Sequence, residues 1–455
     1  MEMISYIINT VLFFGGVHFY VCGRKDRFLV VFYLIMTSFM GLLPAMVVKT
    51  GDLGMLLCFM VLLLQILKSF SVKGVNDDAL GKTAIIMYVY IAARSFASIL
   101  FNEDSLVDIL LTIRPWLFWL TYFTFRNITL KDFEKSWDTI FVCVLISTAL
   151  NLLQYLGLNF GNYHALAMGS RCGLPYNIII AMFWICLTKK SYAIVCTPLL
   201  LVAFIMGSSR LLLVIGLMMF AFITLSTKKI KNINMKVIGI VFVVVGLCTM
   251  FFLFQSGLLN RFGRINEISN DVNGLSRITQ TSAVKESYLE SGSSATMLFR
   301  LVLAKERWTY MWNNPQYMLF GIGPIYDDPR NPYNRFNFYL GTARLGGGGI
   351  HQIDTVDISF VTPFFRYGIV GLIIYILMIV NVCRELYKGR KYSALINSAY
   401  LCALVYVLQS FGSAHFERFA PVSFILIAAG VSYSERKEMK GTACGSNAKK
   451  VSVKI

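Results

Sequence analysis

The sequence predicts an all-α polytopic integral membrane protein with about 12–13 transmembrane helices and one large external loop near the C-terminus. The first observation is composition. The 455 residues are 56% hydrophobic and 15% charged, whereas soluble domains carry about 25% charged residues. The second is that apolar runs recur along most of the chain, and about 20 apolar residues suffice to cross a bilayer as a helix. The third is an alternation of basic and lysine-poor loops between these runs.

Apolar spans are expected to begin near residues 4, 28, 53, 83, 105, 139, 174, 191, 210, 236, 357, 393 and 418. The first has spanning length and lacks the basic n-region of a cleaved signal peptide, so we expect it to be the first transmembrane helix. The spans near 174 and 191 are short.

Loop charge predicts the orientation of these spans. Loops after odd-numbered spans are basic, such as "GRKDR", "KKIKNINMK" and "RELYKGRK", whereas loops after even-numbered spans, such as "NED" and "GSAHFE", are poor in lysine. Basic loops collect on the cytoplasmic side, so the N-terminus is expected outside and the C-terminus inside. The net charge of +18 then reflects membrane topology and does not indicate nucleic-acid binding.

The spans divide the chain into four parts. Residues 1–257 are expected to form an N-terminal transmembrane bundle of about ten spans. Residues 258–356 form the external loop, which is too long for a simple connector. Residues 357–435 contain the C-terminal transmembrane helices, and residues 436–455 form a cytoplasmic basic tail. Within the loop, "ATMLFRLVLAKERWTYMWNNP" has helical periodicity.

Several arginines are expected on the external side, where short loops rarely carry them. Arg210 opens a span there, and Arg171 lies in "GSRCGLPYN". Arg300 and Arg307 are seven residues apart in the loop helix and therefore share one face. Planar guanidinium groups pair with phosphate oxygens, so this set suits a pyrophosphate. The alternatives are arginines that snorkel to lipid head groups and an ordinary amphipathic surface helix.

Acidic groups that could act as a general base are few on this side. Asp354 and Asp357 lie three apart where the chain enters the eleventh span, and His351 precedes them. A carboxylate at a membrane boundary loses hydration, which raises its pKa toward the range that suits a general base. The alternative is that these aspartates belong to a polar helix start, where the helix dipole favours them. Asp327 and Asp328 in "YDDP" are expected to be exposed acids of a turn.

Four charged residues are predicted inside the spans: Arg94, Asp108, Arg114 and Arg366. Charged side chains in spans usually face the bundle or a hydrated cavity. They are expected either to line a cavity for a lipid phosphate or to form structural pairs.

Four stretches resemble the bacterial O-antigen polymerase and O-antigen ligase superfamily: "GSRCGLPYN", "MGSSRLLLVIG", "RLVLAKERWTYMWNNPQYMLFGIGP" and "DISFVTPFFRYGIVG". The resemblance implies a polytopic enzyme of the bacterial inner membrane with its active site facing the periplasm. It implies glycosyl transfer between glycans carried on undecaprenyl pyrophosphate, or onto lipid A core for ligases, with a lipid pyrophosphate as leaving group and neither metal nor cofactor. Further partners implied are a chain-length regulator and a flippase.

The resemblance also implies roles for residues. Arg210 would bind or stabilise the lipid-linked pyrophosphate, and Arg171 and Arg300 would contact the same group or the second substrate. Ligases of the superfamily typically carry a His-Asn pair before the glycine that matches Gly368. At the positions of that pair, this sequence has Asp357 and Ile358, and His351 lies six residues before Asp357.

This departure favours a polymerase of O-antigen or capsule repeat units over a ligase. An insertion in the alignment could bring His351 to the position of the ligase histidine. The identity of the general base therefore stays open between Asp357, Asp354 and His351. A transporter of lipid-linked glycans and a non-catalytic export partner are further alternatives, although the chain shows no repeated halves and its long external loop argues against a transporter.

Overall fold

The computed structural model describes residues 2–43, 49–69, 77–102, 105–159, 161, 163–164, 173–188, 193–207, 212, 215–216, 219–220, 296–327, 336, 338, 342–343, 350–351, 353, 358–410 and 412–451. These residues form an all-α membrane protein whose strand content, within this part of the chain, is one antiparallel pair of two-residue strands. The predicted fold class is confirmed.

The first half of the bundle contains α1 (Glu2–Val21), α2 (Lys25–Met36), α3 (Thr50–Ser69), α4 (Ala79–Asn102), α5 (Leu106–Leu117), η1 (Phe118–Thr121), α6 (Tyr122–Phe125), α7 (Leu130–Leu153), η2 (Gln154–Leu156), α8 (Ile178–Leu187) and α9 (Ala193–Gly207). The second half contains α17 (Val361–Gly389), α18 (Ala394–Gln409), η4 (His415–Glu417) and α19 (Phe419–Val451). Between them lie α15 (Thr296–Asn313), α16 (Pro315–Phe320), β1 (Thr342–Ala343) and β2 (Ile350–His351). The predicted loop helix is therefore α15.

Six of the described helical segments are long and apolar enough to cross a membrane: Met3–Val21, Thr50–Lys68, Ala79–Phe101, Leu106–Phe125, Leu130–Leu153 and Val361–Gly389. Shorter apolar helices are Ile178–Leu187, Val195–Gly207 and Ala394–Gln409. These segments and α2 and α19 match predicted spans. The span predicted near 236 and most of the span near 210 lie outside the described residues, so the full number of spans stays a prediction.

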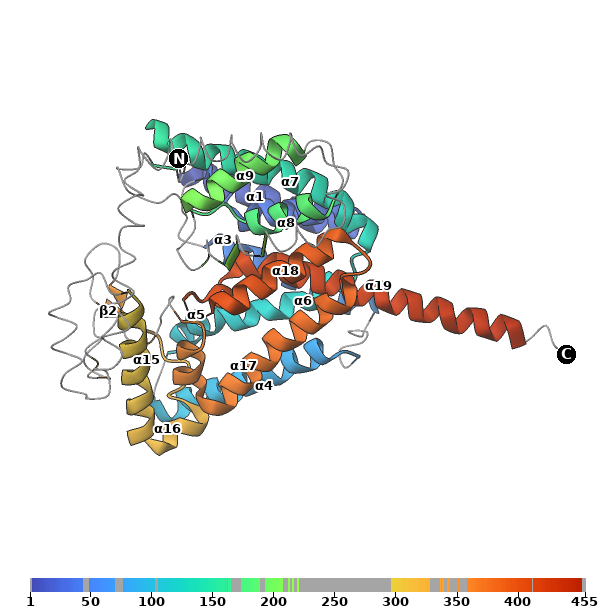
Figure 1. The fold of residues 1–455 in the computed structure, drawn as a ribbon. Helices are drawn as coiled ribbons and strands as arrows, with labels where there is room; N and C mark the ends of the chain where they lie inside the picture. Colours follow the sequence, from blue (N-terminus) through green and yellow to red (C-terminus); the bar gives the residue numbers. More distant parts are fainter. Residues whose placement is uncertain are drawn as a thin grey trace.

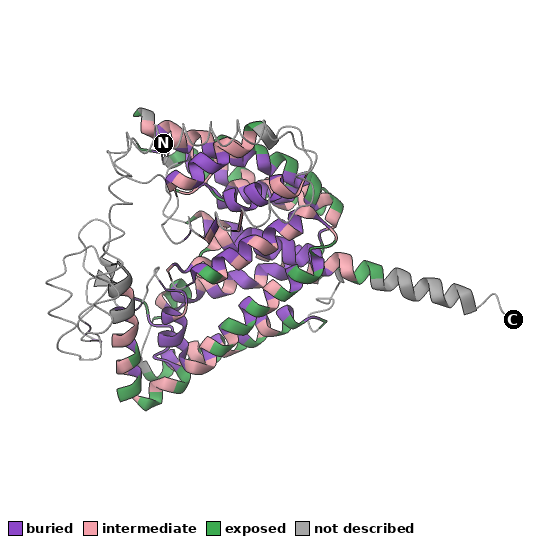
Figure 2. Ribbon diagram, in the orientation of Figure 1, coloured by how far each residue is buried: buried purple, intermediate pink, exposed green. Residues whose placement is uncertain are grey.

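The helices pack around a continuous apolar core. Neighbours in space include α1 with α2, α2 with α7, α4 with α17, α8 with α18, and α17 with α19 (Figure 1). Large aromatic rings fill the interior; for example, Trp137 meets Trp184 at 5.8 Å and Phe424 at 5.0 Å between ring centroids. The outward sides of helices such as α4 and α17 are exposed (Figure 2). The residues exposed along the middle of these helices are apolar, among them Val89, Phe96, Ile373 and Val380, as a lipid-facing surface requires.

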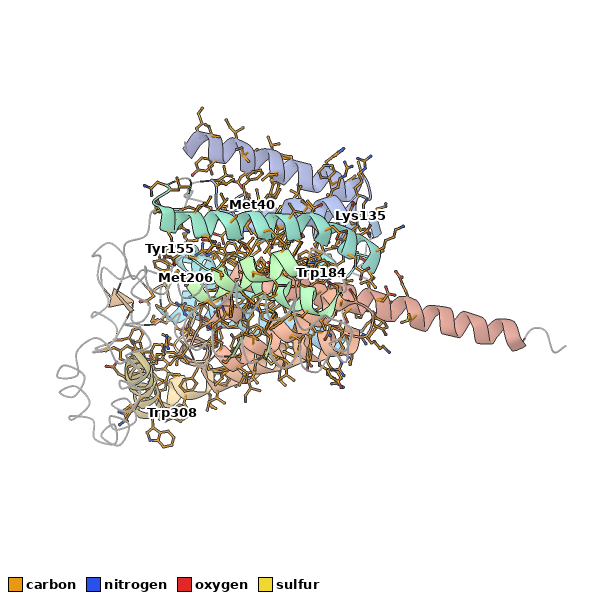
Figure 3. All side chains as sticks on the ribbon, turned by 45° about the horizontal axis from the view of Figure 1, so that its top comes forward. Met40, Lys135, Tyr155, Trp184, Met206 and Trp308 are labelled. Carbon is orange, nitrogen blue, oxygen red and sulfur yellow. The ribbon has the colours of Figure 1, made fainter. Side chains whose placement is uncertain are left out.

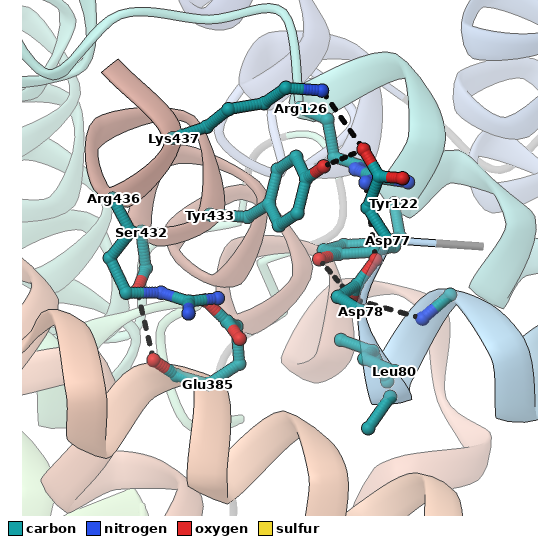
Figure 4. Close-up of polar contacts among 12 residues, drawn as sticks. Asp77, Asp78, Leu80, Tyr122, Arg126, Glu385, Ser432, Tyr433, Arg436 and Lys437 are labelled. Carbon is teal, nitrogen blue, oxygen red and sulfur yellow. Dashed lines mark hydrogen bonds and ion pairs between the residues drawn. The ribbon is translucent and has the colours of Figure 1, made fainter. Parts of the chain in front are cut away.

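A buried ion pair joins helix ends at one end of the bundle (Figure 4). The Arg126 Nη2 lies 3.1 Å from Asp78 Oδ1, and both side chains are 4% exposed. Asp78 Oδ2 also accepts from the Tyr122 hydroxyl at 2.9 Å and from the Gly81 backbone N–H at 3.0 Å. The Arg126 guanidinium lies 3.7 Å from the Tyr433 ring centroid. The charge pair is thereby held by α4, α6 and α19 together.

Two further contacts lie beside this pair in Figure 4. Asp77 Oδ2 accepts from the Tyr433 hydroxyl and from Lys437, each at 2.9 Å. Glu385 of α17 pairs with Arg436 of α19. All of these residues adjoin loops that the charge pattern predicts to be cytoplasmic, so residues assigned to one side in the sequence also meet at one end in space.

Candidate functional site at the outer end of the bundle

Two glycines bring the external loop into direct backbone contact with α17. Gly368 interrupts α17 with φ 66° and ψ −166°, and Gly321 has φ 74°. A Cβ on Gly321 would lie 2.2 Å from the Arg366 carbonyl oxygen, and a Cβ on Gly368 would lie 2.3 Å from the Leu319 carbonyl oxygen. Only glycine fits both the left-handed backbone and this close approach.

The loop also supplies donors to the carbonyl groups at the kink. The Ile322 N–H donates to the Phe365 carbonyl at 3.1 Å, and the Gly323 N–H donates to the Arg366 carbonyl at 2.9 Å. Buried carbonyl groups need such partners. The break in α17 and the docking of the loop segment therefore stabilise each other.

Helix α4 secures the same junction from the other side. The Tyr90 hydroxyl donates to the Tyr367 carbonyl at 2.7 Å, and the Arg94 Nη2 donates to the Gly321 carbonyl at 2.9 Å. Tyr90 and Arg94 are four residues apart and so share one face of α4. Arg94 thus faces the bundle, as predicted for a charge within a span, and its described partner is a loop carbonyl.

The other charges predicted inside spans have separate surroundings. The Arg114 Nη1 pairs with Asp52 Oδ2 at 2.7 Å, which is the structural pairing that the sequence allowed. Asp108 accepts from the Ser105 hydroxyl at 2.8 Å at the start of α5. Arg366 is 2% exposed beside the kink.

The described part of the external loop has its own small core. Its buried members are Met311, Ile322, Ile325, Phe336, Phe338, Ile353, Phe364 and Phe365. The last two belong to the first turns of α17, so the loop core and the beginning of that helix are one packed unit.

Arg307 of α15 lies inside this unit. Its side chain is 1% exposed and pairs with Glu306 at 2.9 Å. The guanidinium carbon lies 4.6 Å from the Phe338 ring centroid. Burial lowers the pKa of Arg307 to about 10, and the charges of Glu306 and Asp327 oppose that shift. Arg307 is therefore cationic at neutral pH but faces the loop interior. Arg300, on the same helix, is half-buried.

The expectation of exposed acids in "YDDP" is wrong for Asp327. Asp327 is 5% exposed, and its Oδ2 accepts from the Ile353 N–H at 2.9 Å. A buried N–H requires an acceptor, and this carboxylate supplies one. Asp327 therefore anchors the backbone at Ile353, a residue that lies between the candidate bases His351 and Asp354 in the sequence.

The remaining predicted site residues divide into two groups. His351 is described only through its backbone, in β2, where it pairs with Thr342 of β1. Arg171, Arg210, Asp328, Asp354 and Asp357 lie outside the described residues. Their roles stay predictions.

The turn between α18 and α19 completes the described outer end. The Ser359 N–H donates to the Ser410 carbonyl at 3.0 Å, and the Ser359 hydroxyl donates to the Ser413 carbonyl at 2.9 Å. Within this turn, His415 Nε2 lies 2.7 Å from Gln409 Oε1. Burial, aided by Arg418, lowers the pKa of His415 to about 3. A base that weak does not suit proton abstraction near neutral pH.

Two parts of this site do not follow from the sequence patterns, and a third has a partial signal. Gly321 and Gly368 belong to separate motifs, and nothing in either motif indicates that their backbones touch. The spacing of Tyr90 and Arg94 on one helix face is a usable signal for a shared target. No local pattern indicates that Asp327 binds a backbone N–H 26 residues away.

Comparison with known proteins gives one family match. Residues 195–376 match the family model described as O-antigen ligase. The match covers about two fifths of the chain and includes α9, α15, α16 and the kink of α17. No curated protein matches the chain.

Proposed function

We propose that the chain is a member of the O-antigen polymerase and ligase superfamily, as the family match over residues 195–376 supports, and that it polymerises undecaprenyl-pyrophosphate-linked oligosaccharide repeat units. The product is a bacterial surface polysaccharide, either O-antigen or capsule. The protein acts in the inner membrane with its active site toward the periplasm.

The observation that carries this proposal is the junction of Gly321 with Gly368. Both glycines belong to stretches that resemble the superfamily, one within the loop and one after it. The structure brings these two stretches into contact, at the end of the bundle that the loop charges predict to be external. A lipid-linked substrate presents its pyrophosphate at this level of a membrane, so the two stretches suit a role beside that group.

The proposed reaction joins two lipid-linked glycans. A hydroxyl oxygen of the acceptor forms a bond to the anomeric carbon of the donor, and the bond from that carbon to the pyrophosphate oxygen breaks. The hydroxyl proton passes to a base, for which Asp357, Asp354 and His351 are the candidates. Undecaprenyl pyrophosphate leaves with its electron pair, and Arg210 stabilises the developing charge. Arg171 and Arg300 bind the same group or the second substrate.

A ligase is the second candidate, because the matching family is described as O-antigen ligase. It would move a finished glycan to lipid A core or another acceptor. The position of Asp357 in the register where ligases carry histidine favours the polymerase. A chain-length regulator and a flippase are the partners that we propose for either activity.

The test is a gel of surface and lipid-linked glycans from a strain that lacks the gene and is complemented with variants. Polymerase function predicts that the ladder collapses to a single repeat unit attached to its final acceptor. Ligase function predicts full-length chains that persist on the lipid carrier. An unchanged pattern in the strain without complementation would refute both.

Arg210→Lys tests the proposed pyrophosphate contact within that experiment. Lysine keeps the charge but loses the planar fork, so we expect at least a tenfold loss of polymer at equal protein level. Arg390→Lys, at the end predicted to be cytoplasmic, is the matched control. Equal ladders from the two variants would rule out the pyrophosphate role of Arg210.

A further inference from the structure

Helix α15 has an apolar flank that the loop core does not cover. Its buried face presents Leu303, Arg307 and Met311 at intervals of four residues. The neighbouring flank carries Trp308 and Trp312, which are 49% and 66% exposed. Figure 3 shows Trp308 at the margin of the molecule. The Trp308 ring stacks on Phe364 at 5.2 Å between ring centroids, which fixes the orientation of the flank.

Helix α16 extends this flank toward the bundle. Leu319 and Phe320 at its end are 53% and 47% exposed. The segment that follows docks on the kink of α17, and the Tyr90 hydroxyl lies 3.4 Å from the Phe320 carbonyl oxygen. Leu319 and Phe320 thus lie beside α4 and α17, and α15, which carries Trp308 and Trp312, packs against α16 and α17.

Those neighbouring sides are the lipid-facing surfaces of two candidate membrane spans. Phe96 and Leu100 of α4 are 64% and 58% exposed, and Ile373 of α17 is 51% exposed. In Figure 1, α15 lies at the outer end of the bundle and runs across the direction of α4 and the longer part of α17. A helix placed crosswise at a membrane boundary, with tryptophan on an apolar flank, has the character of an interfacial helix.

We propose that α15 and α16 form an interfacial unit whose flank of Trp308, Trp312, Leu319 and Phe320 inserts into the outer leaflet of the bilayer. The indole rings lie at the boundary between head groups and acyl chains, where an apolar ring with one polar N–H is favoured. Leu319 and Phe320 contact acyl chains beside α4 and α17. The occupant of the flank is lipid, and not water or a second copy of the chain.

This inference has a consequence that rests on the proposed function. An inserted flank fixes the height of the loop core relative to the bilayer. The loop core, with Asp327 and Ile353 at its edge, then stays at the level of the head groups, where a lipid-linked pyrophosphate lies. Loss of insertion would lower polymer output by misplacing the loop, without any change in the residues that contact substrate.

Tryptophan fluorescence tests the insertion directly. The chain has six tryptophans; the other four, Trp116, Trp119, Trp137 and Trp184, are buried. The full-length protein is placed in lipid nanodiscs that contain phosphatidylcholine brominated at carbons 6 and 7, or at carbons 11 and 12, of one acyl chain. We expect the shallow bromines to quench at least twice as strongly as the deep ones. Trp308→Phe with Trp312→Phe should remove most of that quenching, since phenylalanine preserves the apolar surface and the fold.

Two results would overturn the proposal. Quenching of Trp308 and Trp312 by aqueous iodide, with none by bromolipid, would place the flank in water. Quenching by neither, together with a dimeric mass in nanodiscs, would assign the flank to a second copy. Because fluorescence does not depend on glycan synthesis, bromolipid quenching in a protein that makes no polymer would uphold the interface and refute only the proposed function.

Discussion

His415 shows how burial determines the protonation of a single side chain at the outer end. Its ring stacks on Tyr406 with 4.5 Å between centroids, and Nε2 lies within hydrogen-bond distance of Gln409. The charged form would lose hydration there, and Arg418 adds a like charge. His415 is therefore a neutral structural residue and not a candidate base.

The depressed pKa of His415 predicts acid sensitivity of the fold. The pKa is about 3 in the folded protein, whereas the ordinary pKa of histidine is 6.5. Above pH 6.5 the ring is neutral in both the folded and the unfolded state, and the folded state has its full stability. As the pH falls from 6.5 toward 3, only the unfolded state binds the proton, so stability decreases by ~1.4 kcal/mol per pH unit. Apparent melting temperatures at pH 7.5 and pH 5 should drop less for His415→Gln than for the wild type. An equal drop in both proteins would contradict this assignment.

At the scale of elements, the break in α17 is the feature that positions the loop. A continuous helix would satisfy its own carbonyl groups and offer nothing to α16 or α4. The kink at Gly368 instead leaves carbonyl groups that Ile322, Gly323 and Tyr90 satisfy. Arg94 then contacts the loop carbonyl at Gly321. Three elements that are distant in the sequence are joined by backbone contacts rather than by apolar packing alone.

Gly321→Ala and Gly368→Ala should each disrupt this junction. Both glycines combine positive φ with ψ near 180°, a backbone conformation that is essentially confined to glycine and costs other residues about 1–3 kcal/mol. A side chain at either position would also collide with the facing backbone at 2.2–2.3 Å. We expect a lower apparent melting temperature and a strong loss of polymer. Gly23→Ala separates the two effects, because Gly23 also has positive φ, 73°, but open space around it. Equal losses in all three variants would show that strain, and not the backbone contact, explains the effect.

At the scale of the whole molecule, the two ends of the bundle differ in how they are held together. The end predicted to be cytoplasmic is held by charged side chains, with the buried pair of Asp78 and Arg126 at its centre. The end predicted to be external is held mainly by backbone contacts and the loop core, with Arg94 and the Arg114–Asp52 pair as charged contacts. This division suits a proposed enzyme whose substrates enter from the outer side, since the opposite end has no need to open.

Neighbouring aspartates allow a matched test of the buried pair. Asp78→Asn leaves the charge of Arg126 buried without its counter-ion, which typically costs about 3–5 kcal/mol. Asp77→Asn removes an exposed pair with Lys437, whose side chain is 57% exposed, and should change little. Apparent melting temperatures in detergent should separate the two variants clearly. A larger loss of stability in Asp77→Asn than in Asp78→Asn would contradict the assignment of the Asp78–Arg126 pair as the central contact.

The class of protein, the positions of most described helices and the loop helix α15 follow from the sequence alone. These features depend on local hydropathy and periodicity, because a bilayer requires each spanning segment to satisfy its own backbone and expose apolar side chains. The resemblance to the superfamily is also carried by short stretches, and the family match supports it.

How those stretches meet depends on the tertiary structure. The fold places Gly321 against Gly368, turns Arg307 into the loop core and makes Asp327 an acceptor for the backbone at Ile353. Each of these outcomes depends on a contact between segments at least 20 residues apart in the chain. Local sequence reports the character of a side chain, but burial and partners arise only when distant segments meet.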